Sequence, residues 1–190
     1  MRRDDMRLRH LTPPQVVDSA REALAYRRSW FKLLTSLVLT VIAVVFIFNL
    51  VLGLAIVRGD SMRPALREWD LMLYSRLGGE WRRGDIVSLQ TENTYFSKYV
   101  KRIVGLPGET VDISDDGFVL IDGVAIDEPY VYSTTHPMEE IPFPLTLRAG
   151  EYFVLGDNRE HSRDSRSIGT VKRAEIHGKI LFVFRTGKGF

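Results

Sequence analysis

The sequence predicts a mainly β protein in which one N-terminal transmembrane helix precedes a compact barrel-like or sandwich-like domain. Three observations predict this class. Residues 33–57 are 25 consecutive residues without a charged side chain. Residues 58–190 contain short runs that are rich in β-branched, aromatic and leucine residues. Turn-forming residues punctuate these runs, a spacing that is typical of barrels and sandwiches.

Composition excludes several classes of site and partner. The 190 residues suffice for one domain with additional segments, and 45% are hydrophobic, which is enough for a packed core. There is no cysteine, so disulfides, thiolate zinc sites and a cysteine nucleophile are excluded. Residues 1–32 hold eight Lys/Arg and four acids, which leaves 18 of the 26 basic and 20 of the 24 acidic residues for 33–190. This slightly acidic remainder argues against nucleic-acid binding.

The uncharged run is long enough to span a bilayer. About 20 helical residues cross the roughly 30 Å hydrocarbon layer. We expect the helix near Leu33–Leu52, ending at Gly53, with residues 54–57 as an apolar strand or a membrane-embedded lead-in. A cleaved signal peptide is the first alternative, but the run starts late and is too long for one. A buried core helix is the second alternative. It is disfavoured because the run is apolar on every side.

The charges that flank the span predict its orientation. Arg27, Arg28 and Lys32 precede it, so the positive-inside rule predicts that the N-terminus is cytoplasmic. The chain then divides into a cytoplasmic basic segment (1–32), the transmembrane helix and lead-in (33–57) and an extracytoplasmic β-rich domain (58–190).

The β-rich part is expected to contain seven strands. Asp115–Gly117 and Asp122-Gly123 lie at hairpin spacing between strands. Residues 127–150 contain four prolines and are expected to form an irregular arm, and residues 171–178 a brief helix ended by Gly178. The expected strands are residues 69–75, 85–90, 95–104, 110–114, 118–122, 151–156 and 179–184.

A polar turn, RGDSMRPAL (58–66), directly follows the apolar run. In one interpretation, Asp60 or Ser61 caps a short helix. In the other, Ser61 is a nucleophile at the membrane surface and needs a proton acceptor. None of the four histidines lies in an obvious triad motif, and the first is on the predicted cytoplasmic side; they are His10, His136, His161 and His177.

A lysine is the next candidate for the base. An ordinary lysine is protonated at pH 7, and lowering its pKa to near 8 costs roughly 3 kcal/mol, which burial can supply. Lys101 lies in an apolar strand, where Tyr99 and Ile103 share its face. Spacing alone leaves open that this face is solvated. Lys98 is a weaker candidate because it is nearer to a polar stretch.

Four blocks in order resemble type I signal peptidases, which are membrane-anchored serine–lysine endopeptidases. The blocks are SMRPAL (61–66), GDIV (84–87), YVKRIVGLPGE (99–109) and GDNREHSRDSR (156–166). The resemblance covers the span and essentially all of residues 58–190.

The resemblance implies a role for individual residues. Ser61 corresponds to the nucleophile, Lys101 to the general base and Ser162 to a hydroxyl that orients the lysine. Asp164 and Arg166 correspond to a structural salt bridge. The resemblance also implies pocket candidates, which are Val57, Met62, Leu66, Tyr99 and Val100.

Two positions differ from the sequence motifs that are usual in the family. Ala65 replaces the usual threonine of the nucleophile block, which puts one local hydrogen bond in doubt. At the position of Gly59, some members of the family have a serine that helps to bind the oxyanion. Other members have glycine there, as this chain does. Oxyanion binding then rests on backbone N–H groups, chiefly that of Ser61.

The resemblance implies removal of signal peptides from exported preproteins after small-x-small sequences, through an acyl-enzyme. No metal or organic cofactor is implied. Implied partners are signal-peptide-bearing preproteins, membrane lipid and the neighbouring secretion translocon. The implied location is the cytoplasmic membrane, with a single span. A peptidase dedicated to one substrate, a self-cleaving repressor and a membrane-anchored adaptor without catalysis are the alternatives.

Overall fold

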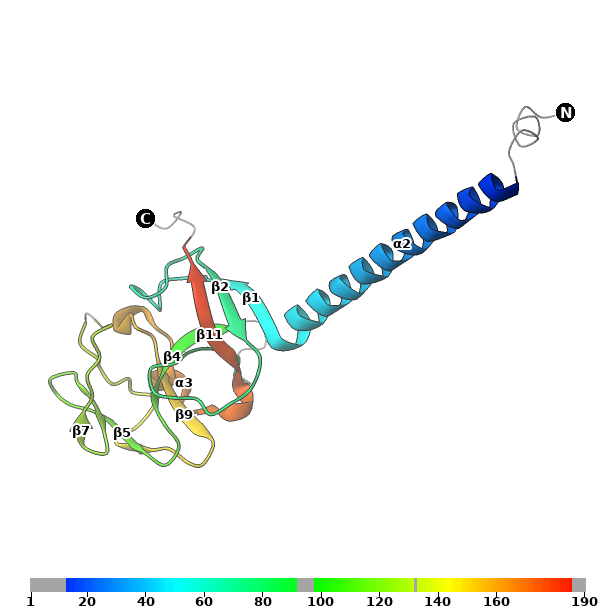
Figure 1. Cartoon of the computed structure of the whole chain (residues 1–190). Helices are drawn as coiled ribbons and strands as arrows, with labels where there is room; N and C mark the ends of the chain where they lie inside the picture. Colours follow the sequence, from blue (N-terminus) through cyan, green and yellow to red (C-terminus); the bar gives the residue numbers. More distant parts are fainter. Residues whose placement is uncertain (1–12, 92–97, 132, 186–190) are drawn as a thin grey trace. The chain divides into compact units, whose positions relative to one another are not determined.

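The computed structural model describes residues 13–91, 98–131 and 133–185, with side chains described from residue 24 onward. The chain divides into two compact units, residues 1–47 and 48–190. The first unit is helical and the second is built from short strands (Figure 1).

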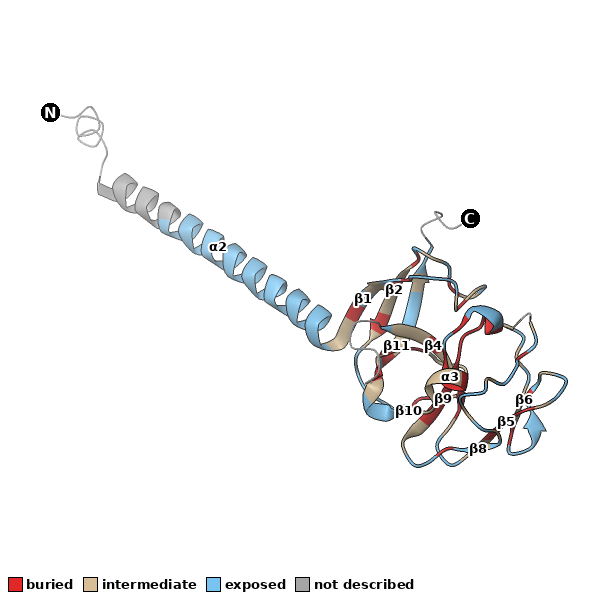
Figure 2. Cartoon of the chain, turned by 180° about the vertical axis from the view of Figure 1, so that it is seen from behind, coloured by how far each residue is buried: buried red, intermediate tan, exposed pale blue. Residues whose placement is uncertain are grey.

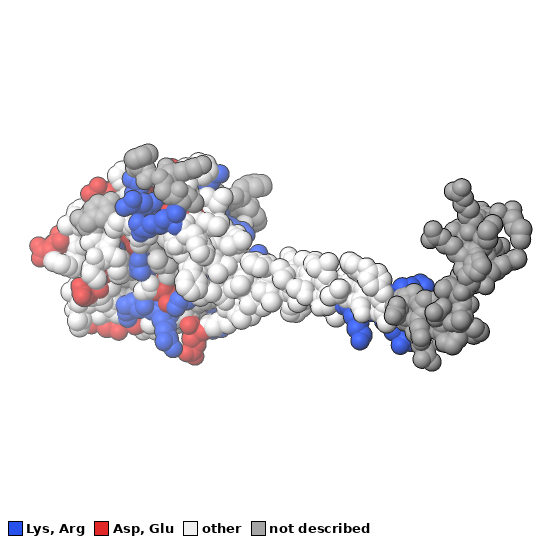
Figure 3. Space-filling model, turned by 45° about the horizontal axis from the view of Figure 1, so that its top comes forward, with Lys and Arg blue, Asp and Glu red and all other residues white. Residues whose placement is uncertain are grey.

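The helical unit contains α2 (Pro13–Phe46), and a π-helical turn, η1 (Ile47–Val51), follows this helix at the boundary with the second unit. Its described side chains are exposed (Figure 2), and beyond Lys32 they carry no charge (Figure 3). Within the described residues, Leu24–Val51 is the one helix that is long and apolar enough to cross a membrane. The helix begins earlier than the predicted residue 33, because the polar segment before it is also helical.

The β unit contains eleven strands within the described residues. All of the strand pairs are antiparallel. The strands are β1 (Leu52–Ile56), β2 (Leu71–Ser75), β3 (Ile86–Leu89), β4 (Tyr99–Gly105), β5 (Thr110–Ile113), β6 (Val119–Ile121), β7 (Val124–Ala125), β8 (Leu145–Thr146), β9 (Glu151–Leu155), β10 (Val171–Lys172) and β11 (Ile176–Phe184).

The strands form two sheets, of seven and four strands. The order is β1-β2-β11-β3-β4-β9-β10 in the larger sheet and β7-β6-β5-β8 in the smaller. The larger sheet curls, so that strands far apart in the sequence lie side by side (Figure 1). This arrangement confirms the predicted mainly β class. Each of the seven expected strands is present with shifted ends, although residues 95–97 of the third lie outside the described residues.

Two expectations about glycines are wrong. Gly53 does not end the helix, because it lies inside β1 and pairs with Tyr74 of β2. Residues 171–178 do not form a helix that ends at Gly178. They form β10, a 3₁₀ turn at Arg173–Glu175, and the start of β11.

Gly178 lies in β11 because that strand runs between β2 and β3. A Cβ at Gly178 would lie 2.0 Å from the carbonyl oxygen of Ser75, so only glycine fits there without a shift. Residues 127–150, the expected irregular arm, contain β8 and otherwise turns and bends within the described residues.

One of the three apolar clusters lies under the polar turn that follows β1. It contains the buried side chains of Val57, Met62, Leu66 and Met72. Met62 and Leu66 belong to the turn and Val57 directly precedes it, so their burial fixes its path. The turn is thereby held against the curled sheet.

Candidate active site

The turn that carries Ser61 begins with a left-handed residue, Gly59, whose φ is 81°. The Asp60 carbonyl accepts a hydrogen bond from the Arg63 N–H at 3.1 Å, and the Met62 carbonyl accepts one from Leu66 at 2.8 Å. These bonds form successive turns, not a helix that Asp60 or Ser61 would cap. The capping interpretation is therefore wrong.

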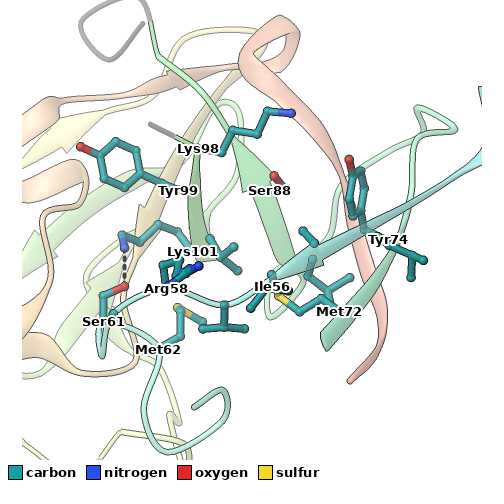
Figure 4. A pocket seen from close by; sticks show the side chains of 16 residues that line it. Ile56, Arg58, Ser61, Met62, Met72, Tyr74, Ser88, Lys98, Tyr99 and Lys101 are labelled. Carbon is teal, nitrogen blue, oxygen red and sulfur yellow. Dashed lines mark hydrogen bonds between the residues drawn. The ribbon is translucent and has the colours of Figure 1, made fainter. Parts of the chain in front are cut away.

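Lys101 meets Ser61 across 40 positions of sequence. Its Nζ lies 2.8 Å from Ser61 Oγ, the dashed contact in Figure 4. The lysine sits on β4 opposite Val87, and its side chain is 2% exposed. The face that it shares with Tyr99 and Ile103 packs into the core, so the solvated-face alternative is wrong. We refer to Ser61 and Lys101 as the dyad.

Burial controls the ionisation of Lys101. It lowers the pKa of the ammonium group from 10.5 to about 8. The negative charges of Asp164 and Asp157 act in the opposite direction, and Arg166 adds to the lowering. At pH 7 a pKa of about 8 leaves roughly a tenth of the lysine neutral, which is the form that can accept a proton.

The loop after β9 holds the backbone of the nucleophile turn. The Asn158 N–H donates to the Ser61 carbonyl at 3.1 Å, and its side-chain amide donates to the Asp60 carbonyl at 3.2 Å. A Cβ at Gly156 would lie 2.2 Å from Ser162 Oγ and 2.5 Å from the Ser61 carbonyl oxygen. Glycine is therefore required for this close approach.

Two buried ion pairs fix the same loop. Arg102, next to Lys101, binds Asp157 through Nε at 2.8 Å and Nη2 at 2.6 Å. The expected pairing of Asp164 with Arg166 is present, at 2.9 and 3.0 Å. Both side chains of that pair are nearly inaccessible to solvent. Such pairs cost desolvation but specify one geometry, which suits a loop that must position other groups.

Ser162 is buried beside Gly156 but does not reach the dyad by a hydrogen bond. Its Oγ has no hydrogen-bond partner within the described residues. The contact with Lys101 that the resemblance implies is therefore not made in this geometry.

A cleft of about 450 Å³ opens beside the dyad (Figure 4). Four of the five pocket candidates line it, namely Val57, Met62, Tyr99 and Val100. The fifth, Leu66, does not, because it packs in the apolar cluster beneath the turn.

Sequence reasoning missed other residues of the cleft, among them Arg58, Tyr74 and Ser88. Arg58 lies over the Trp69 ring at 3.9 Å. The serine within the apolar run IVSL (86–89) is a signal that could have been noticed. In the described part of the chain, no group of three His, Cys, Asp or Glu side chains could hold a metal ion.

The family model described as "Signal peptidase, peptidase S26" matches residues 27–185. The chain belongs to this family. The finding confirms the resemblance drawn from the four sequence blocks. The signal peptidase family match includes both members of the dyad, the loop after β9 and most of the long helix.

Curated relatives support the same membership of the signal peptidase family. Signal peptidase I S of Bacillus subtilis (strain 168) is 33% identical over 175 residues, which are 86% of this chain and 93% of the relative. Signal peptidase IB of Staphylococcus aureus (strain N315) is 31% identical over 166 residues, or 75% of this chain and 85% of the relative. A solved signal peptidase I from Enterococcus faecalis V583 is 33% identical, with a TM-score of 0.47, and covers 56% of this chain and 100% of its own.

Proposed function

We propose that this chain is a membrane-anchored endopeptidase that removes signal peptides from exported preproteins through the Ser61–Lys101 dyad. The observation that carries the proposal is the 2.8 Å contact between Ser61 Oγ and the Nζ of a lysine that is 2% exposed. A buried lysine beside a serine hydroxyl is the arrangement that a serine nucleophile without histidine requires. The curated relatives, whose names are signal peptidase I, support the substrate class.

The reaction follows from the protonation state of the lysine. Neutral Lys101 accepts the proton of Ser61, and the Ser61 oxygen attacks the carbonyl carbon of the scissile peptide bond. The resulting lysine ammonium protonates the leaving amine, and an acyl-enzyme remains. A water then gives a proton to Lys101 and attacks the ester carbonyl, and the lysine ammonium returns that proton to the departing Ser61 oxygen, which restores the dyad and releases the signal peptide.

A backbone donor is available for the oxyanion. Within the described residues, no carbonyl or side chain accepts a hydrogen bond from the Ser61 N–H. The Asn158 side-chain amide donates to the Asp60 carbonyl, which belongs to the same peptide unit as the Ser61 N–H, and this contact therefore fixes the orientation of that unit. A pre-oriented N–H of this kind stabilises developing negative charge, so Gly59 needs no side chain for the purpose.

The cleft suits an extended peptide with small side chains. β1 is the terminal strand of the larger sheet, and Leu54, Ala55 and Ile56 of this strand line the cleft. An edge strand offers unpaired backbone groups to an incoming peptide. We infer that the peptide binds there with small residues one and three places before the cleaved bond.

The membrane explains the position of Ser61. The helix at Leu24–Val51 supports a single span with the basic N-terminal flank in the cytoplasm. Ser61 follows the last uncharged residue, Val57, by four positions and is thereby held near the lipid surface. A signal peptide also lies in the bilayer, so enzyme and substrate share one plane, close to the secretion translocon. This confinement reduces the orientational cost of the encounter.

The test is cleavage of a model preprotein by the purified full chain, Ser61→Ala and Lys101→Ala, in detergent or liposomes. We expect the wild type to cut after a small-x-small sequence and both variants to lose at least about a thousandfold in rate. Lys179→Ala, which removes a partly exposed lysine that pairs with Asp85 and does not line the cleft, is the control and should retain activity.

Circular dichroism should show that all four proteins are folded. Full activity of Ser61→Ala would exclude the nucleophile assignment. A folded wild type that cuts no preprotein would instead favour a peptidase dedicated to one substrate or an adaptor without catalysis.

A further inference from the structure

The Glu128 carboxylate, in the irregular arm at residues 127–150, has two hydrogen-bond donors on one oxygen. Its Oε1 accepts a hydrogen bond from Arg159 Nη2 at 2.7 Å and another from the Tyr130 hydroxyl at 2.8 Å. The Arg159 side chain is 1% exposed and that of Glu128 is 10% exposed, so the ion pair is buried. None of the three residues lines the cleft beside the dyad, and the proposed reaction uses none of them directly.

Tyr130 extends this contact to the ion pair beside Lys101. The centroid of its ring lies 4.0 Å from the guanidinium carbon of Arg102, which binds Asp157 through two hydrogen bonds. Burial raises the pKa of the Tyr130 hydroxyl well above its ordinary value, and the negative charge of Glu128 adds to this. The hydroxyl is therefore protonated at neutral pH and donates to Glu128.

The loop after β9 is held on both sides of Asn158 by groups that the arm contacts. Arg159 Nε donates to the Gly156 carbonyl at 3.0 Å. Arg102 binds the Asp157 carboxylate through Nε at 2.8 Å. Asn158 therefore lies between two neighbours in the chain whose side chains are fixed in place, and one of these is bound directly by the arm.

Asn158 transmits this constraint to the nucleophile turn. Its side-chain amide donates to the Asp60 carbonyl at 3.2 Å, and its N–H donates to the Ser61 carbonyl at 3.1 Å. The Asp60 carbonyl and the Ser61 N–H belong to one peptide unit, and this N–H is the proposed oxyanion donor. A rotation of that unit weakens the bond to the oxyanion but leaves the apolar walls of the cleft in place. Such a change acts on the transition state more than on peptide binding.

We propose that Glu128 is a positioning residue of the reaction, which acts with Tyr130 to fix Asn158 and, through it, the Ser61 N–H. We call Glu128 and Tyr130 the arm clasp. The inference rests on the proposed peptidase function and adds residues outside the cleft to its machinery. The arm clasp predicts a lower kcat at unchanged KM when it is broken. An ion pair that serves stability alone predicts less folded protein with an unchanged kcat.

The experiment measures kcat and KM of the purified full chain in detergent with a model preprotein. Glu128→Ala removes the acceptor of both hydrogen bonds, and we expect kcat to fall about tenfold while KM changes less than about twofold. Glu128→Gln keeps an oxygen that can accept both bonds and should recover most of the loss. Glu109→Ala is the matched control and should keep the wild-type kcat. The Glu109 carboxylate also accepts two hydrogen bonds, from Arg83 and the Leu106 N–H, which lie outside the loop after β9.

A double variant tests whether the effect passes through Asn158. Asn158→Ala removes the side-chain amide that holds the Asp60 carbonyl. If Glu128 acts through this amide, Glu128→Ala should lower kcat less than about threefold on the Asn158→Ala background, instead of about tenfold. If the two effects on kcat simply multiply, the residues act independently, and the proposed route through Asn158 is overturned.

Circular dichroism monitors folding, and Tyr130→Phe guards against a folding defect in Glu128→Ala. It keeps the ring over Arg102, removes only the hydrogen bond to Glu128 and should lower kcat about threefold. An unchanged kcat in folded Glu128→Ala, or in Tyr130→Phe if Glu128→Ala does not fold, overturns the arm clasp and leaves the peptidase standing. An equal fall in Glu109→Ala also overturns it. If the folded wild type cuts no preprotein, the proposed function fails, and this inference fails with it.

Discussion

At the scale of single residues, burial favours the neutral form of Lys101, whereas the nearby carboxylates of Asp164 and Asp157 favour the protonated form. The fall in its pKa from 10.5 to about 8 corresponds to roughly 3 kcal/mol. Because the folded-state pKa is the lower one, this cost to stability is present below pH 8 and fades as the pH rises towards 10.5. Burial of Lys101 therefore lowers the stability of the folded protein, but it places a base beside Ser61.

The first prediction is the pH profile of cleavage. Since the neutral lysine is the proposed base, kcat/KM should rise about tenfold between pH 7 and pH 9 and level off above the pKa of about 8. Lys101→Arg should be inactive at every pH, because arginine remains protonated. A flat profile from pH 6 to 9, or an active arginine variant, would contradict the assignment of Lys101 as base.

The sequence was sufficient to predict which residues compose the dyad but not the environment of Lys101. Alternation places Tyr99, Lys101 and Ile103 on one strand face, yet it does not say whether water or protein covers that face. The covering side chains, Val87 among them, come from another strand. The cleft residues Tyr74 and Ser88 were missed for the same reason, because they come from two different strands, β2 and β3.

At the scale of elements, β11 shows where local sequence preference is overridden. Residues 171–178 contain good helix formers, but only Arg173–Glu175 turn as a short 3₁₀ helix. From Ile176 the chain pairs with β3 on one side and from Lys179 also with β2 on the other. The backbone hydrogen bonds to the two neighbouring strands outweigh the helix propensities of these residues, which amount to a few tenths of a kcal/mol per residue.

The second prediction concerns the close packing of this strand. Gly178→Ala should destabilise the protein by about 1–3 kcal/mol, because the added Cβ overlaps the backbone oxygen of Ser75. Gly79→Ala is the matched control, since nothing lies within 4 Å of a Cβ there, and it should change stability by less than about 0.5 kcal/mol. Unfolding curves in detergent measure both, and equal stabilities of the two variants would contradict the packing argument.

At the scale of the whole molecule, the strong contrast between charged and uncharged segments made the organisation predictable. An uncharged run of 25 residues predicted the apolar helix, whereas its early start at Pro13 was missed. Residues 13–31 contain three alanines and three arginines, which favour helix, and their polar and charged side chains interrupt the apolar pattern. Criteria for a membrane span search for apolar residues, so they do not detect a polar N-terminal extension of the helix.

The last prediction is the orientation of the span. Residues 1–32 carry eight Lys/Arg, against four in the 20 residues that follow Val57, so the N-terminus should stay cytoplasmic. In membranes sealed with the cytoplasmic face inside, added protease should remove a C-terminal tag and leave an N-terminal tag intact.

Changing Arg27, Arg28 and Lys32 to glutamate leaves five of the eight basic residues before the span, which nearly abolishes the charge bias. The fraction with a protected N-terminal tag should therefore fall clearly below the wild-type value. The control changes Arg148, Arg163 and Arg173 to glutamate, at exposed positions of the β unit, and should leave the orientation unchanged. Because only charges close to a span direct its insertion, equal protection in both triple variants would show that the basic flank does not set the topology.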